Sequence, residues 1–438
     1  MDLITQAPRG TQDVLPEDSY RWQYVERTAL SVAEDFGYRE IRTPVFEHTN
    51  LFLRSVGETT DVVQKEMYTF EDKGGRSITL RPEGTAGATR AALEHGLLSG
   101  ALPVKVSYVT SCYRYEKSQK GRYREFHQFG VECFGAAAPQ ADAETISLAM
   151  TVLESLGLQK IALHINSIGC PACRAKYTEA LRAYFGSHRE ELCETCQGRL
   201  ERNPMRILDC KSPVCQKIAA DAPVMLEYLC DDCKAHFETV KACLDAAEIA
   251  YTVDPHIVRG LDYYTRTVFE LVAENGLVVA GGGRYDGLVE ELGGAPQPGL
   301  GFAMGLERLL MVMEEQQCRF PEPPACELYL VSMGQEAANR CYALATRLRR
   351  GGVAVESDIV GRSLKAQMKY ADKRGARYTI VVGEDELRTG VAQLKDMATG
   401  CTEEIRLDDS LYTALYNKSL DRQLAGMADL FGTVAETE

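Results

Sequence analysis

The part of the sequence that decides the fold reads Cys112-Tyr113-Arg114-Tyr115-Glu116 and, after a polar loop, Arg124-Glu125-Phe126-His127-Gln128-Phe129-Gly130-Val131-Glu132. We interpret it as two antiparallel strands, residues 105–115 and 125–134, joined by a basic loop. Because successive side chains of a strand point to opposite faces, one face gathers a cation, an aromatic ring, an amide and a carboxylate. Such a face could hold an anionic ligand that carries a ring. An exposed hairpin with a solvated charged tip fits the same spacing, so both interpretations stay open.

The flanking segments extend this pair of strands into a larger domain with an insert. A helical period over residues 19–36 precedes a short strand at 38–44. Strand patterns at 267–273 and 277–280 form a hairpin around Asn275-Gly276, glycines 281–283 follow it, and a helix is predicted for 304–315. The segment between these two parts differs in composition. We therefore predict one domain from residues 1–167 and 251–320, interrupted by an insertion domain at 168–250.

A third domain follows the prolines at 321, 323 and 324. Short apolar strands at 328–332, 353–356 and 378–382 alternate with helical patterns, which predicts an α/β domain over residues 325–425. The patterns therefore predict a domain of helices and strands with antiparallel pairs, a cysteine-rich insert with helical stretches, and a C-terminal α/β domain.

Composition and charge exclude several classes of protein. The 438 residues include 49 Lys and Arg against 63 Asp and Glu, a net charge of −14, which argues against unspecific coating of nucleic acid but allows a local basic patch. No apolar run approaches the roughly 18 residues of a membrane helix. The N-terminus lacks the basic start and apolar core of a signal peptide. We expect a soluble cytoplasmic protein with no membrane partner.

The cysteines are unusual for that compartment, since nine of the fifteen lie between Cys170 and Cys243. In a reducing cytosol such clustering indicates metal binding or packing rather than disulfides. One tetrathiolate Zn²⁺ site is predicted from Cys170, Cys173, Cys193 and Cys196. The other four candidates, Cys210, Cys215, Cys230 and Cys233, could build a second site. Reduced cysteines packed in a core are the alternative.

Three further strings are rich in glycine or tyrosine: Arg259-Gly260-Leu261-Asp262-Tyr263-Tyr264, Gly281-Gly282-Gly283-Arg284-Tyr285 and Gly301-Phe302-Ala303-Met304-Gly305-Leu306-Glu307-Arg308. Each by itself is typical of a turn. The last one is neither a P-loop nor a Rossmann pattern, because it lacks Gly-Lys-Ser/Thr and does not open a βαβ unit.

Taken together and in this order, the strings resemble the class II aminoacyl-tRNA synthetases, and among them the histidyl-tRNA synthetase family. Residues 38–44, 114–132 and 301–308 are similar to the family's three common motifs, of which the first forms a dimer. Residues 259–264 and 281–285 resemble the two strings peculiar to enzymes for histidine, and residues 81–85 resemble the amino-acid-binding loop. The resemblance covers nearly the whole chain. It implies a class II catalytic domain with an α+β fold built on an antiparallel sheet, a helical cysteine-rich insertion domain and a C-terminal α/β anticodon-binding domain.

The resemblance also implies an activity. ATP, with Mg²⁺ on its outer phosphates, would activate histidine to histidyl-adenylate, and the histidyl group would pass to the 3′ end of histidine tRNA. The implied ATP-binding residues are Arg114 on the α-phosphate, Arg308 on the γ-phosphate, Phe126 stacked on adenine, and Glu116 near its amino group. Arg114 and Arg259 would be catalytic, with Arg259 lying across the α-phosphate and the substrate carboxylate, where related enzymes place an extra magnesium ion.

The implied histidine-binding residues are Glu83, Gly84, Thr85, Gln128, Glu132, Arg259, Tyr263 and Tyr264. Glu83 would pair with the ammonium group, while Glu132 and Tyr264 would read the two imidazole nitrogens. For tRNA we expect Lys117, Lys120 and Arg122 to contact the acceptor end. Arg362, Lys365 and Lys369, at helical spacing, would contact the anticodon stem-loop, and an ordinary solvated helix face is the alternative. The resemblance also implies a homodimer.

Three rival functions remain. One is the regulatory relative in histidine biosynthesis, which resembles these synthetases but typically lacks the anticodon domain and the string at 259–264. Another is a class II synthetase for a different amino acid, against which the same string argues. The third is a zinc-bearing RNA-binding protein without catalysis, against which the set Arg114, Arg259 and Arg308 argues.

Overall fold

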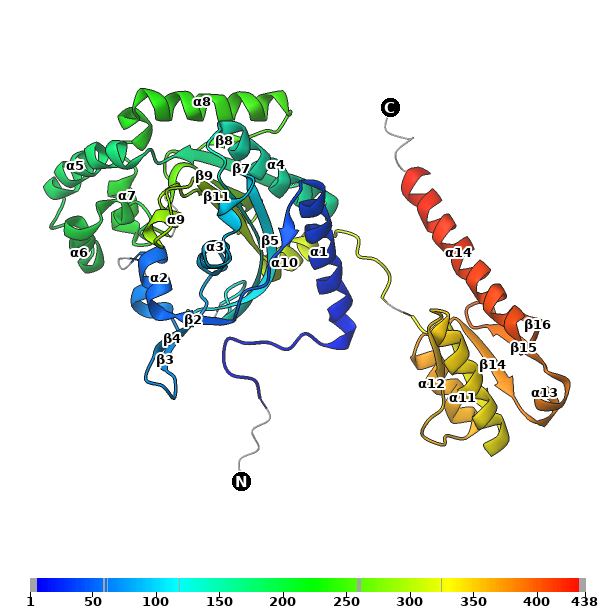
Figure 1. The fold of residues 1–438 in the computed structure, drawn as a ribbon. Coiled ribbons are helices and arrows are strands. Elements are labelled where there is room, and N and C mark those ends of the chain that lie inside the picture. Colours follow the sequence, from blue (N-terminus) through cyan, green and yellow to red (C-terminus); the bar gives the residue numbers. More distant parts are fainter. Residues whose placement is uncertain are drawn as a thin grey trace. The chain divides into compact units, whose positions relative to one another are not determined.

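The chain forms two compact units, one running up to Pro321 and the other from Glu322 onward. The computed structural model describes residues 6–57, 60, 62–117, 119–257, 261–323 and 325–432. Figure 1 shows the elements of both units. Among the described residues, no helix is both long enough and apolar enough to cross a membrane.

The first unit is built on an eight-stranded sheet in the order β1-β5-β6-β11-β10-β9-β7-β8. Its strands are β1 (Arg39–Glu40), β5 (Val104–Tyr113), β6 (Glu125–Phe134), β7 (Ile161–Ser167), β8 (Thr252–Val253), β9 (Thr265–Ala273), β10 (Val278–Arg284) and β11 (Gly299–Gly305). All neighbours are antiparallel except β1 with β5 and β7 with β8. The predicted α+β fold on an antiparallel sheet is therefore confirmed.

One face of the sheet is covered by helices that bury the main apolar core. These are α1 (Pro16–Asp35), α4 (Pro139–Ser155), α8 (Asp231–Ala246) and α10 (Leu306–Glu315). The alternation of β6 decides which side chains meet them, since Phe129, Val131 and Cys133 lie in this core. Phe126, Gln128 and Glu132 are left for the opposite face.

The opposite face carries the smaller helices α3 (Thr85–Glu94) and α9 (Leu288–Glu291), and α3 lies within the curve of the sheet (Figure 1). Beside them are α2 (Thr49–Val56), a π-helical turn (Val62–Glu66), a 3₁₀ turn (Leu97–Ser99), and a three-stranded sheet in the order β2-β4-β3. These strands are β2 (Phe46–His48), β3 (Thr69–Glu71) and β4 (Ser77–Leu80). Tyr263 and Tyr264 pack here as well.

Several predicted boundaries are wrong. The strand expected at 38–44 is only the two residues of β1. The glycines at 281–283 were expected after a strand, but they lie inside β10. Glycine is needed in this strand, since a side chain at Gly282 would overlap the backbone of Gly301 on the neighbouring strand. The helix expected at 304–315 begins two residues later, at Leu306.

The insert is helical, as predicted. It contains α5 (Pro171–Ser187), α6 (Glu194–Arg202), α7 (Pro213–Ala219) and α8, with 3₁₀ turns at Pro204–Ile207 and Met225–Tyr228. It has a small core of its own, in which Tyr177, Leu181 and Phe185 pack against cysteines.

The second unit is an α/β domain around a five-stranded sheet in the order β13-β12-β14-β15-β16. Its strands are β12 (Leu328–Ser332), β13 (Val355–Ser357), β14 (Tyr378–Val382), β15 (Val391–Asp396) and β16 (Thr402–Arg406). Its helices are α11 (Gln335–Arg350), α12 (Leu364–Lys373), α13 (Glu384–Thr389) and α14 (Asp409–Gly432). The parallel core of β13, β12 and β14 matches the prediction, whereas the antiparallel β15–β16 hairpin was not predicted.

Candidate functional site

A cavity of about 440 Å³ opens on the sheet face that carries α3. Its walls come from the β5–β6 hairpin, the loop before α3, strands β10 and β11, and the residues before β9. The predicted site residues that line it are Glu83, Thr85, Arg114, Glu116, Arg122, Phe126, Gln128, Tyr263, Tyr264 and Arg308. Arg259, the predicted catalytic arginine, lies outside the described residues. A cavity of this size suits a small molecule or a nucleotide.

Glu132, another predicted site residue, does not itself line this cavity: it is buried behind the lining residue Tyr285, with only 1% of its surface exposed. The Tyr108 hydroxyl donates to one of its carboxylate oxygens at 2.8 Å, and the Tyr285 hydroxyl donates to the other. Burial raises the pKa of Glu132 to about 8, although these hydrogen bonds oppose the rise. The two tyrosine hydroxyls therefore hold the carboxyl group of Glu132 in one orientation behind the cavity wall.

Glycines on the neighbouring strands make room for this group. A Cβ atom at Gly130 or at Gly84 would overlap the ring of Tyr108, and one at Gly301 would overlap the carboxylate of Glu132. Gly84, predicted to bind substrate, thus lies behind the wall of the cavity and allows Tyr108 to approach. Neither Tyr108 nor Tyr285 was predicted to contact Glu132. Tyr285 belongs to the string at 281–285, whereas no signal in the sequence marks Tyr108.

Glu83 supplies a second buried carboxylate, 4% exposed, at the start of α3. It accepts hydrogen bonds from the backbone N–H groups of Thr85 at 2.7 Å and Ala86 at 2.9 Å. Burial raises the pKa of Glu83, and these N–H groups limit the rise because a helix N-terminus favours negative charge. Arg81 fixes the loop by donating to the carbonyls of Thr43 at 2.9 Å and Ser111 at 2.6 Å. The result is a fixed acceptor suited to an ammonium group.

Three arginines, Arg114, Arg122 and Arg308, line the rest of the cavity. Arg114 donates to the carbonyl of Pro82 at 2.9 Å, and its guanidinium lies over the ring of Phe126 at 5.2 Å. Arg308 donates to the carbonyls of Gly121 at 3.0 Å and Val278 at 2.7 Å. Burial and the charges of Arg122 and Arg114 lower the pKa of Arg308, although the carboxylates of Glu116 and Glu307 oppose this. Such a cluster favours a polyanion such as a triphosphate.

Glu116 and Glu307 hold the hairpin and α10 in place. Glu116 pairs with Arg122 at 3.0 Å. Glu307 accepts from the backbone N–H of His127 at 2.9 Å and pairs with its Nδ1 at 3.0 Å. This hydrogen bond to Glu307 raises the pKa of His127.

The predicted tRNA contacts are distributed over both units. On the β5–β6 loop, Lys120 lies 3.4 Å from Glu315, whereas Arg122 turns to Glu116 and the cavity. Lys117 lies in the same loop.

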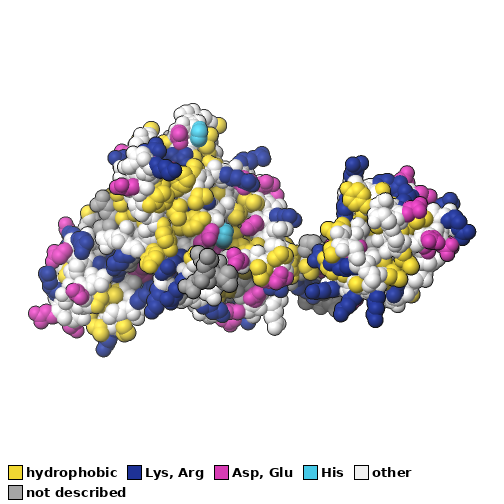
Figure 2. All heavy atoms as spheres, turned by 90° about the horizontal axis from the view of Figure 1, so that it is seen from below, with side chains coloured by type: hydrophobic (Ala, Val, Ile, Leu, Met, Phe, Trp, Pro, Cys, Tyr) yellow, Lys and Arg dark blue, Asp and Glu magenta, His cyan; other side chains and the backbone are white. Residues whose placement is uncertain are grey.

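On the second unit, Lys365 and Lys369 are exposed on α12. Arg362 does not share their helical spacing, a correction to the prediction. It precedes α12, pairs with Asp358 at 2.7 Å and lies 4.2 Å from the centre of the Tyr370 ring. Figure 2 shows Lys and Arg side chains interspersed with Asp and Glu on the visible face of this unit.

The cysteines of the insert form two clusters, and their membership corrects the predicted zinc set. Cys170, Cys173, Cys230 and Cys233 form one, and Cys193, Cys196, Cys210 and Cys215 form the other. The predicted set took two members from each. The cause is the helix packing: the first cluster joins the starts of α5 and α8, and the second joins the start of α6 to the start of α7. Either group of thiols could hold a metal ion.

Comparisons with known proteins agree with this geometry. The model of the histidyl-tRNA synthetase family matches residues 10–309, and that of the anticodon-binding domain matches residues 327–413. A histidine–tRNA ligase of Acetivibrio thermocellus is 56% identical over 93% of this chain and 98% of its own, and one of Caldanaerobacter subterraneus subsp. tengcongensis is 54% identical with the same coverage. The crystal structure of apo S. aureus histidyl-tRNA synthetase is similar with a TM-score of 0.81 and 42% identity, covering 94% of this chain and 100% of that one.

Proposed function

The chain belongs to the histidyl-tRNA synthetase family, and we propose that the cavity of its first unit is where both steps of the reaction take place. The enzyme activates histidine with ATP and transfers the histidyl group to tRNA. The observation that supports this location best is the gathering of the buried carboxylate of Glu83 and three arginines around one cavity, with Glu132 bonded to the lining residue Tyr285. The regulatory alternative is not favoured, because the relatives at 54–56% identity are all ligases and the chain contains an anticodon-binding domain.

In this proposal the carboxylates hold histidine. Glu83 pairs with the α-ammonium group, with Thr85 and Gln128 beside it on the cavity wall. Glu132 and Tyr264 each meet one imidazole nitrogen, and Tyr263 lines the pocket. Tyr108 and Tyr285 orient the carboxyl of Glu132. Apolar amino acids are rejected because they would leave these buried polar groups unpaired.

The arginines hold ATP. A carboxylate oxygen of histidine attacks the α-phosphorus, a new phosphorus–oxygen bond forms, and the bond to pyrophosphate breaks. Arg114 and Arg259 stabilise the charge that develops on the α-phosphate, and Arg308 holds the γ-phosphate. Phe126 stacks on adenine and Glu116 meets its amino group. For this stacking the guanidinium of Arg114, now over the Phe126 ring, must move toward the phosphates.

Magnesium completes the ATP site in this proposal. Mg²⁺ prefers oxygen ligands from phosphates and one or two carboxylates, and Asp209 and Glu270 offer such oxygens on the cavity wall. When bound, it neutralises charge on the outer phosphates. The cysteines of the insert are candidates for structural Zn²⁺ in the two groups that the structure brings together, and this is independent of the ATP site.

The same proposal assigns the domains of the chain and the partners that they bind. Residues 1–167 and 251–320 form the catalytic domain, 168–250 the insertion domain and 325–425 the anticodon-binding domain. Lys117, Lys120 and Arg122 contact the acceptor end of histidine tRNA, and Arg362, Lys365 and Lys369 contact its anticodon stem-loop. Residues 38–44 pack against their counterparts in a homodimer, so light scattering should give the mass of two chains. We expect the enzyme to act in the cytoplasm.

The decisive experiment measures ATP–pyrophosphate exchange with each of the twenty amino acids and, on the same preparation, charging of histidine tRNA. Exchange should occur with histidine alone. Arg259→Ala should reduce it by about 10² or more, the scale of losing a preorganised charge at the transition state. Arg189→Ala, at an exposed arginine of the insert, is the matched control. Exchange with a different amino acid, or a full rate in Arg259→Ala, would contradict the proposal.

A further inference from the structure

Eight of the nine cysteines of the insert converge in two groups. The first cysteine cluster is Cys170, Cys173, Cys230 and Cys233, and the second cysteine cluster is Cys193, Cys196, Cys210 and Cys215. Within each, the Sγ atoms all lie within 4.8 Å of one another. Among the described residues the ninth cysteine, Cys243, joins neither cluster. Packing of reduced thiols would explain two cysteines that lie side by side, but it does not explain two separate groups of four.

The spacing of the sulfur atoms fits a tetrahedral metal ion. With Zn–S bonds of about 2.3 Å, the edge of an S₄ tetrahedron is about 3.8 Å. The Sγ atoms of Cys170 and Cys173 are 3.5 Å apart, and those of Cys193 and Cys210 are 3.9 Å apart. A disulfide would need about 2.05 Å. The pairs are therefore too far apart to be bonded and close enough to share one ion.

Backbone N–H groups point at sulfur atoms in both clusters. The N–H of Cys230 donates to Cys173 at 3.1 Å in the first cluster. In the second cluster the N–H of Cys193 donates to Cys215 at 3.3 Å, and that of Ser212 donates to Cys210 at 3.5 Å. Donors of this kind orient ligands and stabilise the negative charge of a metal-bound thiolate. Four thiolates leave no open position, which is the form of a structural rather than a catalytic zinc site.

The second cysteine cluster lies next to a segment that reaches the cavity. Asp209, which precedes the ligand Cys210, lines the cavity. Between α6 and Asp209, Arg206 forms an ion pair with Asp262 at 2.5 Å, and Asn203 donates to the same carboxylate at 3.4 Å. Asp262 directly precedes Tyr263 and Tyr264 in the chain. Residues 203–210 therefore connect the second cysteine cluster with Asp262, the residue before the two tyrosines of the cavity.

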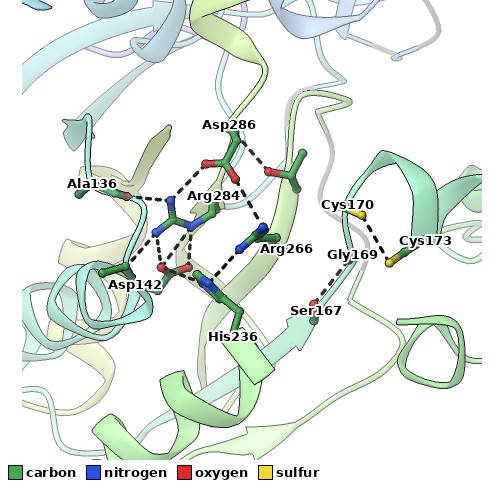
Figure 3. Close-up of polar contacts among 12 residues, drawn as sticks. Ala136, Asp142, Ser167, Gly169, Cys170, Cys173, His236, Arg266, Arg284 and Asp286 are labelled. Atoms are coloured by element: carbon green, nitrogen blue, oxygen red, sulfur yellow. Dashed lines mark hydrogen bonds and ion pairs between the residues drawn. The ribbon is translucent and has the colours of Figure 1, made fainter. Parts of the chain in front are cut away.

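The first cysteine cluster lies where the insert leaves and rejoins the sheet. Gly169, next to Cys170, accepts a backbone hydrogen bond from Arg266 at 2.9 Å, and Arg266 has the left-handed φ of 51°. Helix α8 begins just after Cys230 and carries His236, which pairs with Asp142 at 3.2 Å and contacts Arg266 at 3.1 Å. Figure 3 shows Cys170 and Cys173 next to Gly169, and the network around Arg284 across from them.

We propose that each cysteine cluster binds one structural Zn²⁺, so that the chain carries two, and that the zinc of the second cluster positions Arg206 against Asp262 and thereby the tyrosines of the cavity. The part of this inference that concerns histidine rests on the function proposed above. The zinc content does not. Cys196 acts here as a metal ligand, and Arg206 as a positioning residue that does not itself touch substrate.

The first test is the metal content of the full-length protein, purified under reducing conditions without chelator from cells supplied with zinc. Native mass spectrometry and elemental analysis should give about two zinc ions per chain. Cys173→Ser and Cys196→Ser should each lose one, whereas the matched control Cys243→Ser should keep both. A protein without zinc, or variants that keep both ions, would overturn the proposal. Cobalt substitution adds a readout, since four thiolates around Co²⁺ give the absorption bands of a tetrahedral site.

The second test separates the positioning role from a loss of folding. Arg206→Gln should keep both zinc ions but raise the KM for histidine by roughly 5- to 100-fold, as expected for loss of a charged hydrogen bond, with the KM for ATP little changed. Arg206→Lys should restore part of the affinity. If Arg206→Gln leaves the KM for histidine unchanged, the positioning role is refuted while the zinc sites stand. If the zinc-loaded wild type shows no exchange with histidine, the proposed function fails instead.

Discussion

Replacing Asp142 with Asn should destabilise the first unit by about 3 kcal/mol, because it leaves the charge of Arg284 buried without its main partner. Arg284 is 1% exposed and Asp142 3%. The Nε of Arg284 donates to both carboxylate oxygens at 3.2 Å, and a second nitrogen donates to one of them. Figure 3 shows this pair, with His236 on the same carboxylate and Asp286 on the other side of the guanidinium.

The expected loss of unfolding free energy follows from the contacts that Arg284 keeps after the substitution. Removing one partner of a buried ion pair costs about 3–5 kcal/mol. Arg284 keeps Asp286 at 3.1 Å and the carbonyl of Ala136 at 2.8 Å, which favours the lower end of that range. The double variant Asp142→Asn/Arg284→Met should lose about 2 kcal/mol less than the sum of the single variants, because it leaves neither member of the buried Asp142–Arg284 pair as an unpaired buried charge.

The loss of stability caused by Asp142→Asn should also depend on pH and become smaller as the pH falls. Burial alone would raise the pKa of Asp142, but the hydrogen bond from His236 and the charge of Arg284 hold it below its ordinary value of 3.8. A carboxylate with a lowered pKa stabilises the fold above its unfolded pKa and loses that contribution as the pH falls through the folded pKa. The difference between wild type and Asp142→Asn should therefore stay constant between pH 6 and 8 and shrink below about pH 4.

The single tryptophan makes the assay specific for this unit. Trp22 lies on α1 and packs against the main core, and the second unit contains no tryptophan. Urea unfolding followed by its fluorescence at pH 7 reports the first unit alone. Asp221→Asn, at an exposed position of the insert, is the matched control and should change stability by less than about 0.5 kcal/mol. A loss below about 1 kcal/mol for Asp142→Asn, or strict additivity in the double variant, would refute the reasoning.

Three further predictions concern the cavity and its surroundings. Glu307→Gln should lower the pKa of His127, whose ring packs on Trp22, so that the pH midpoint of the tryptophan fluorescence moves down relative to the wild type; an unchanged midpoint would remove Glu307 as the cause. Gly301→Ala places a Cβ against Glu132 and should weaken histidine binding in calorimetry by at least about tenfold, with ATP binding retained. Tyr264→Phe should weaken histidine binding by roughly 1–3 kcal/mol without affecting ATP, and equal losses for both ligands would make it a scaffold residue.

The main helices and strands could be predicted from the sequence because the periodicity of apolar side chains is complete within a single helix or strand. The alternation along residues 125–134 gives both the strand β6 and the side of the sheet on which Gln128 and Glu132 lie. The amphipathic period at 19–36 corresponds to α1. The predictions were wrong where a neighbouring strand decides the boundary of an element or the role of a residue. The three glycines of β10 are an example, since they allow the close approach of β11.

The candidate site shows the same division. Ten of the residues that line the cavity could be predicted from the sequence, because each lies in a string with a characteristic order of residue types. It did not identify Tyr108, whose role depends on the register that sets it opposite Gly130 and beside Glu132. Arg284 was read as part of a glycine-rich string, whereas it turns into the core against Asp142, 142 residues away in the chain.

The sequence by itself determined the fold class and the helical insert, and it led to the proposed residues for histidine and ATP, because all of these depend on periodicity and on the order of motifs. Only the tertiary structure decided which cysteines meet. Cys170 and Cys173 join Cys230 and Cys233, across an insert of helices, rather than the nearer pair Cys193 and Cys196. Spacing along the chain cannot distinguish these sets, since either could close a tetrahedral site. Only the packing that brings the starts of α5 and α8 together, and those of α6 and α7, separates them.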